Sequence, residues 1–152
     1  MNTLLETLDS ITHVGIDTSP FIYLIEAHPL YLPLVAPLFE RVEKGEISAV
    51  TSAITVAEVT VLPLRQQRYE LREQYLNLLL NNRNLDIVTV DIQMAQAAAE
   101  LRAQFGVRLP DAIQVAAAII TNCEIFITND RSLKQITAVQ VLVLDDLLGP
   151  NE

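Results

Sequence analysis

Residues 109–130 read LPDAIQVAAAIITNCEIFITND. Pro110 favours the first turn of a helix, and the run after it is apolar on almost every side, so the segment predicts a helix at the centre of the molecule. Residues 124–128, EIFIT, have the composition of a strand, and Asn129 and Asp130 are typical turn residues. A central helix that leads directly into a strand indicates an α/β fold.

The rest of the sequence repeats this alternation. Further strands are expected over residues 12–17, 47–51, 86–90 and 139–144, and helices over 20–27, 33–44, 53–62, 66–82 and 91–105. Pro63 is expected to break or kink the chain between two of these helices, and Ser19 to cap the first helix with Pro20 at its first position. The pattern predicts one domain over residues 1–152, with three α/β/α layers and a central parallel sheet of about five strands.

Composition narrows the class of protein. The 152 residues are 51% hydrophobic and 19% charged, which suits a single packed core. No apolar run reaches the ~18 residues that span a bilayer, and Glu6 and Asp9 stand where a secretory signal would be basic, so we expect a cytoplasmic protein without a membrane segment. Cys123 is the single cysteine, which excludes a disulfide within the chain, and we expect it to be a buried core thiol.

The formal net charge is −9. Such a charge opposes binding to a polyanion, because much of that affinity comes from Lys and Arg that neutralise phosphates. Any RNA site must therefore be local. The charge also fits carboxylates gathered around a metal, or a surface that receives a basic partner, and net charge alone does not choose between these.

Four acidic residues fall where a parallel sheet would gather them. Asp17 closes the first expected strand, Asp130 follows the strand over 124–128, and Asp111 opens the apolar helix before that strand. Glu58 lies within the apolar run TVAEVTVL, where a charged side chain usually requires a partner. Ligands of open α/β sheets bind at the carboxyl ends of the strands, and Mg²⁺ prefers oxygen ligands, so a divalent cation is the simplest common partner.

Each acid taken alone also fits a structural role. Asp17 and Asp130 suit turns or helix caps, and Asp111 suits a helix N-terminus, where the helix dipole favours negative charge. Glu58 could be a core acid paired with an arginine that folding brings near.

Four segments together resemble the PIN-domain family, including the VapC-type toxins of toxin–antitoxin pairs. They are GIDTSPFIYLIE, SAITVAEVTVLPLR, LPDAIQVAAAI and FITNDRSL, in the family's order over roughly residues 12–145. The resemblance implies a PIN-like fold, and it places the family's four acids on Asp17, Glu58, Asp111 and Asp130.

The resemblance also implies a ribonuclease that uses Mg²⁺ or Mn²⁺. Metal held by Asp17, Glu58 and Asp111 would polarise the scissile phosphate and generate hydroxide from bound water, with Asp130 as a supporting or second-metal ligand. In-line attack would leave 5′-phosphate and 3′-hydroxyl ends. Thr128 and Ser19 would orient waters or ligands, although both also suit capping or turn hydrogen bonds.

Two groups of basic residues are candidates for contact with the phosphates of RNA. Arg65, Arg68 and Arg72 recur at spacings that share one helical face if the kink after Pro63 is mild. They also fit a solvated face paired with nearby glutamates. Arg131 and Lys134 follow Asp130 closely and form the second group.

The two histidines, His13 and His28, lack metal-ligand spacing, so we expect a structural role for both, His13 in a strand and His28 in a turn.

Two other phosphate-handling folds fit poorly. A haloacid-dehalogenase-like phosphatase requires a second Asp two places after the first, where Ser19 stands. A receiver domain requires paired acids and a late lysine, and Thr18 and Arg131 stand near those places. The open alternative is a PIN-like module that binds RNA or protein without turnover, which metal-dependent RNA cleavage would distinguish.

The sequence also suggests partners. The apolar residues of 21–42, the likeness to VapC-type toxins and the negative charge lead us to expect a homodimer that binds a small antitoxin-like protein with a basic segment.

Overall fold

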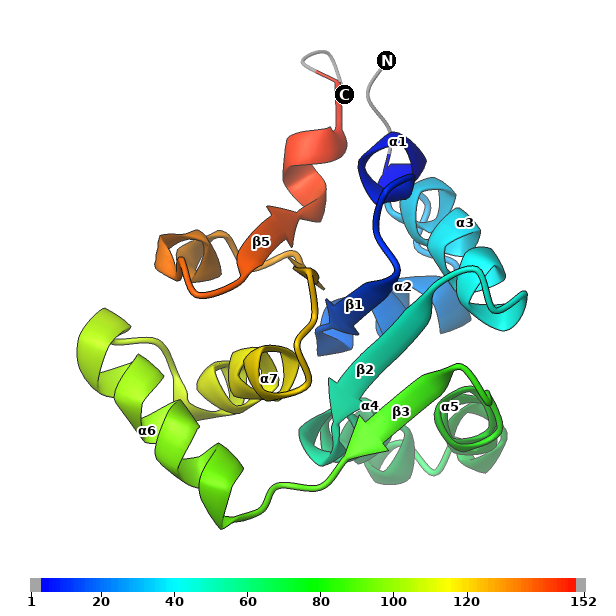
Figure 1. Ribbon diagram of the computed structural model, residues 1–152. Coiled ribbons are helices and arrows are strands. Elements are labelled where there is room, and N and C mark those ends of the chain that lie inside the picture. Colours follow the sequence, from blue (N-terminus) through cyan, green and yellow to red (C-terminus); the bar gives the residue numbers. More distant parts are fainter. Residues whose placement is uncertain (1–3, 150–152) are drawn as a thin grey trace.

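The computed structural model describes residues 4–149, so residues 1–3 and 150–152 of the expected domain lie outside the described residues. Five parallel strands form one sheet in the order β3-β2-β1-β4-β5 (Figure 1). They are β1 (His13–Ile16), β2 (Ser48–Ser52), β3 (Leu85–Val88), β4 (Ile125–Thr128) and β5 (Gln140–Val143). The predicted α/β class and parallel sheet are confirmed.

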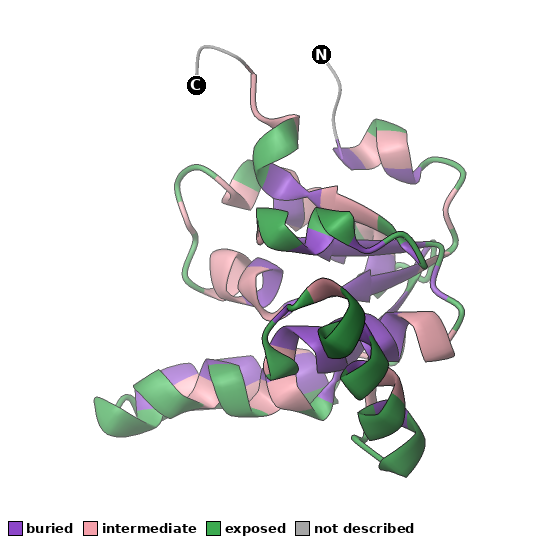
Figure 2. Ribbon diagram, turned by 90° about the vertical axis from the view of Figure 1, so that its left-hand side faces the viewer, coloured by how far each residue is buried: buried purple, intermediate pink, exposed green. Residues whose placement is uncertain are grey.

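The sheet has helices on both faces. Along the chain these are α1 (Leu4–Leu8), α2 (Thr18–Ile25), α3 (Leu32–Glu43), α4 (Ala53–Arg65), α5 (Tyr69–Leu80), α6 (Ile92–Phe105) and α7 (Leu109–Ile120), with short 3-10 turns η1 (Arg131–Gln135) and η2 (Leu144–Leu147). One core cluster joins the sheet to α1, α2, α3 and α5, and a second joins it to α6 and α7. Figure 2 shows the strands largely buried at the centre and exposed residues on the outer surfaces of the helices.

Close packing of α7 on β1 depends on Gly15. A Cβ atom on Gly15 would lie 2.7 Å from the Cβ of Ala118 and 3.1 Å from the Phe126 ring. Residues 111–118 of α7 are all buried, as its apolar sequence predicted. The helix therefore holds its first turn, with Asp111, at a fixed place beside the carboxyl end of β1.

Two sequence expectations about helix ends were wrong. Asp17, not Ser19, caps α2, because its carboxylate follows the strand directly and accepts a hydrogen bond from the N–H of Thr18. Pro63 does not separate the two helices but lies inside α4, and the turn between α4 and α5 comes at Gln66–Arg68, where Gln67 adopts φ +54°. Helix α1 and turn η2 were not expected; Leu4 and Leu8 anchor α1 in the core.

Smaller expectations are confirmed. Cys123 is buried and free, His13 starts β1, and His28 lies in the turn after α2, where its Nδ1 accepts hydrogen bonds from the N–H groups of Leu30 and Tyr31. None of the helices formed by residues 4–149 combines the length and apolarity that crossing a membrane requires.

Candidate functional site

The four predicted acids line one pocket of about 250 Å³, which we call the acidic pocket. Asp17 follows β1 and Asp130 follows β4, and these strands are hydrogen-bonded neighbours at the centre of the sheet. Asp111 reaches the pocket from the first turn of α7 and Glu58 from the middle of α4. The other lining residues are Thr18, Ser19, Ile22, Tyr23, Arg108 and Asn129.

Asp17 is the buried member of the set. One carboxylate oxygen accepts the N–H of Thr18 at 2.8 Å, and the other accepts the Thr128 hydroxyl at 2.7 Å. The pKa of Asp17 is raised to about 6, above all by burial; the hydrogen bonds from Thr128 and Thr18 lower it, and the negative charges of Asp111 and Glu58 add to the rise. A carboxylate in this position is stabilised by any cation that enters the pocket.

Thr128 links the two strand-end acids, because its hydroxyl donates to Asp17 and accepts the N–H of Asp130 at 3.0 Å. Asp130 itself accepts hydrogen bonds from the Ser132 N–H and hydroxyl, so it caps η1 while it lines the pocket. The structure thus gives Asp130 the capping role that the sequence also allowed. Ser19 lines the pocket from the first turn of α2.

Glu58 is not the core acid that its apolar neighbours suggested. Helix α4 buries only Thr55, Val59 and Pro63, which recur every four residues on one narrow face, and Glu58 is exposed. Its carboxylate accepts the Thr18 hydroxyl at 2.6 Å. Its hydrogen-bond partner is therefore Thr18, another residue that lines the pocket, and no arginine among residues 4–149 forms an ion pair with it.

Gln114 is a buried residue that the sequence analysis missed. Its side-chain nitrogen donates to the hydroxyls of Thr55 at 2.7 Å and Thr18 at 3.0 Å, and its oxygen accepts the Ser52 hydroxyl at 2.7 Å. These bonds tie α7 to α2 and α4 beneath the acids. The signal was present, because Gln114 is the one uncharged polar residue within the otherwise apolar run of α7.

Arg108 is the second residue that was missed. Its Nε lies 3.1 Å from the Asp111 carboxylate, while its side chain is 77% exposed. This pair, and the charges of Asp130 and Glu58, raise the pKa of Arg108. Its position three residues before Asp111, just ahead of a helix, was the available signal.

The sequence model of the PIN domain family matches residues 14–139, a range that contains all four acids. The chain belongs to the PIN domain family. None of the curated proteins compared with it matches in sequence.

Solved structures with a similar fold include toxin–antitoxin complexes. One is VapBC2 from Rickettsia felis bound to a DNA fragment from its promoter, with 20% sequence identity and a TM-score of 0.69. The match covers 87% of the present chain and 98% of the VapBC2 chain. A toxin–antitoxin complex from Klebsiella pneumoniae is 21% identical, covers 88% and 98%, and has a TM-score of 0.65. DNA-bound VapBC from Salmonella typhimurium is 18% identical, covers 88% and 98%, and has a TM-score of 0.62. At these identities the likeness shows a shared PIN domain fold.

The predicted basic residues lie outside the acidic pocket of the PIN domain. Arg65 ends α4, Arg68 precedes α5 and Arg72 lies within α5, so the expectation of one shared helical face was wrong. Arg72 pairs with Glu73 and lies over the ring of Tyr69.

The residues of the second basic group, Arg131 and Lys134, also form ion pairs. Arg131 pairs with Asp146 at 2.7 Å, and Lys134 pairs with the same carboxylate. None of the five predicted basic residues is among the described residues that line the acidic pocket.

The donor set of the PIN domain fits a hydrated divalent cation. Within residues 4–149, no three carboxylate, histidine or cysteine side chains are arranged to ligate one ion directly. Mg²⁺ commonly keeps several waters and takes one or two carboxylates directly. Asp17 is buried with a raised pKa, which a cation would counteract, and the other three acids line the same pocket, where they could contact an ion directly or through its waters.

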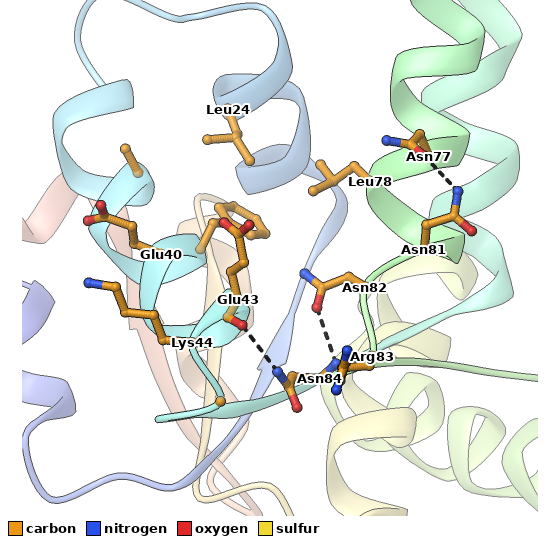
Figure 3. Close-up of a pocket in the computed structure, with 13 residues that line it drawn as sticks. Leu24, Glu40, Glu43, Lys44, Asn77, Leu78, Asn81, Asn82, Arg83 and Asn84 are labelled. Atoms are coloured by element: carbon orange, nitrogen blue, oxygen red, sulfur yellow. Dashed lines mark hydrogen bonds between the residues drawn. The ribbon is translucent and has the colours of Figure 1, made fainter.

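A second and larger hollow, of about 860 Å³, lies between the carboxyl-terminal ends of α3 and α5 (Figure 3). Its lining includes the apolar Leu24, Phe39 and Leu78 and the charged Glu40, Glu43, Lys44 and Arg83. The loops that follow α3 and α5 lead into the amino ends of β2 and β3, so this groove opens away from the acidic pocket at the carboxyl ends of the strands.

Proposed function

We propose that this PIN domain is a metal-dependent ribonuclease that hydrolyses RNA phosphodiester bonds in the cytoplasm, as the toxin of a toxin–antitoxin pair. The observation that carries the proposal is the convergence of Asp17, Glu58, Asp111 and Asp130 on one pocket at the centre of the sheet edge. Membership of the PIN domain family, and the toxin–antitoxin complexes among the similar structures, support it.

The acids have distinct roles in the proposed reaction. Asp17, Glu58 and Asp111 would hold Mg²⁺ or Mn²⁺, directly or through its waters, and Asp130 would support the site from the end of β4. A bound ion supplies Lewis acidity and lowers the pKa of water. Thr128 keeps Asp17 oriented through its 2.7 Å hydrogen bond, and Ser19 lies where it can orient a water.

Contact with the rest of the RNA chain is assigned to residues around the pocket. Arg131 and Lys134 lie just after Asp130, and RNA phosphates would compete with Asp146 for them. Arg65, Arg68 and Arg72 would contact phosphates farther along the strand.

The mechanism is tested by the requirement for metal and by the chemistry of the product ends. Purified protein should cleave single-stranded RNA with Mg²⁺ or Mn²⁺, should stop when chelator is added, and should leave 5′-phosphate and 3′-hydroxyl ends. Cleavage that continues in excess chelator, or 2′,3′-cyclic phosphate ends, would contradict a metal-activated water. Metal binding with no cleavage would favour the non-catalytic module instead.

A partner protein with a basic segment is the second part of the proposal. The groove of Figure 3 combines apolar residues with side chains of both charges, Glu40 and Glu43 beside Lys44 and Arg83, which suits an amphipathic segment. The net charge of −9 favours a basic segment in the partner.

A homodimer is the third part. Among the large apolar residues of 21–42, Phe21, Val35, Leu38, Phe39 and Val42 are buried, Leu30 is exposed, and the others are partly exposed. Further exposed apolar residues lie on α4, at Val61, Leu62 and Leu64, and at the start of α6, where Ile92 is 80% exposed. These residues carry the dimer proposal.

A further inference from the structure

We propose that Arg108 binds a phosphate of the nucleic acid at the acidic pocket, and that its ion pair with Asp111 is the resting position from which it turns to the substrate. The inference rests on the proposed function, because it takes RNA as the ligand.

The charges around the pocket create the need for such a residue. Among the described residues that line it, four are carboxylates and Arg108 alone is basic. A phosphodiester cannot approach four negative charges without local positive charge, and the protein as a whole carries −9. A divalent cation supplies part of this charge, and a basic side chain on the rim supplies the rest.

The geometry leaves Arg108 able to accept a ligand. It contacts Asp111 through Nε only, and the remaining guanidinium N–H groups have no hydrogen-bond partner in the described part of the chain. Its side chain is 77% exposed, whereas that of Asp111 is 12% exposed. The guanidinium therefore presents an unused fork of donors at the mouth of the pocket, which is the geometry that binds phosphate oxygens in pairs.

The backbone around Arg108 is fixed although its side chain is free. Val107 is buried in the core between the sheet and α6 and α7, and Arg108 is the N-cap residue of α7 without a side-chain capping bond. An ion pair with one largely exposed partner contributes little to folding stability. The position of Arg108 is thus determined by the fold, while its side chain is not required to hold the fold.

The other basic candidates lack this combination. Arg131 and Lys134 both pair with Asp146, and Arg72 pairs with Glu73. Neither these three nor Arg65 and Arg68 line the acidic pocket, whereas Arg108 does.

The test combines three measurements on Arg108→Gln, with Arg102→Gln as the matched control because Arg102 is exposed on α6 and does not line the pocket. The first is binding of a fluorescent single-stranded phosphorothioate RNA with Mg²⁺ by anisotropy, because this backbone keeps its negative charge and resists hydrolysis. The second is Mg²⁺ affinity without RNA, by calorimetry. The third is the rate of cleavage of ordinary RNA.

Arg108→Gln should weaken RNA binding about tenfold or more and reduce the slope of log affinity against log salt by about 0.7, the value for one phosphate contact on a single strand. Mg²⁺ should bind as tightly or more tightly, because a competing positive charge has left Asp111. The control should change neither quantity.

Unchanged RNA affinity and salt slope, or no RNA binding by any of the proteins, would overturn the proposal. So would weaker Mg²⁺ binding with a normal salt slope, which would mean that Arg108 only positions Asp111. If the wild-type protein fails to cleave ordinary RNA while Arg108→Gln still lowers the salt slope, the ribonuclease proposal fails and the phosphate contact stands.

Discussion

Replacing Asp17 by Asn should make the protein more stable relative to wild type as the pH rises, by an amount that follows from the pKa of Asp17. The pKa of Asp17 stands at about 6 in the folded protein against an ordinary value of 3.8, with burial as the largest cause. Each pKa unit corresponds to about 1.36 kcal/mol, so the difference is worth about 3 kcal/mol.

The sign follows from where the proton binds more tightly. Because the pKa is higher in the folded state, protonation of Asp17 stabilises the folded state, fully below about pH 4, and this contribution is lost as the pH rises through 6. Asn does not titrate. The free energy of unfolding of Asp17→Asn minus that of wild type should therefore rise by about 2.5 kcal/mol between pH 4 and pH 7.5. Altered hydrogen bonding to Thr128 adds an offset that is nearly the same at each pH.

The assay is urea denaturation followed by circular dichroism, in chelator, at several pH values. Glu124→Gln is the control of opposite sign, because hydrogen bonds from the N–H and hydroxyl of Thr12 lower the pKa of Glu124. Its stabilisation is present at neutral pH and is lost as the pH falls. A difference for Asp17→Asn that stays flat, or that falls as the pH rises, would refute the reasoning about the buried carboxylate.

Three further predictions concern hydrogen bonding, packing and assembly. Gln114→Leu should lower the free energy of unfolding by about 3 kcal/mol, because the buried hydroxyl and N–H of Ser52 lose their acceptor, and a loss under about 1 kcal/mol in urea denaturation would argue against that role. Gly15→Ala should cost about 1–3 kcal/mol through its contact with Ala118, and a double-mutant cycle with Ala118→Gly should recover part of this cost; no coupling would reject the contact as the cause. Light scattering should detect a dimer through the exposed apolar residues of α4, whereas a monomer at all concentrations would remove the dimer from the proposal.

Much of the fold could be predicted from the sequence, because alternating apolar segments of strand and helix length leave few arrangements other than a parallel sheet covered on both faces. The expected strands agree with the observed ones to within two residues at each end. The expected helices differ more from the observed ones, by up to three residues at one end. Pro63 lies within α4, and the turn between α4 and α5 is made by Gln67 in the left-handed conformation, which the sequence does not mark with a glycine.

The candidate site was predictable where position along a strand determines it. Asp17 and Asp130 had to meet once their strands were neighbours. Glu58 was assigned correctly to the pocket but for the wrong reason, since an apolar neighbourhood in sequence does not reveal which face of α4 is buried. Arg108 and Gln114 depend on contacts between α7 and other elements, which the sequence alone does not specify.

The central claim is that the four acids form one metal site, and the Mg²⁺-induced gain in unfolding free energy tests it most directly. It should be measured for wild type, Glu58→Gln, Asp111→Asn and the control Asp86→Asn, an exposed residue of β3 outside the acidic pocket. Wild type and the control should gain about 2.7 kcal/mol at a Mg²⁺ concentration a hundred times the dissociation constant. The two pocket variants should lose most of that gain. An equal gain in all four proteins would contradict a shared metal site.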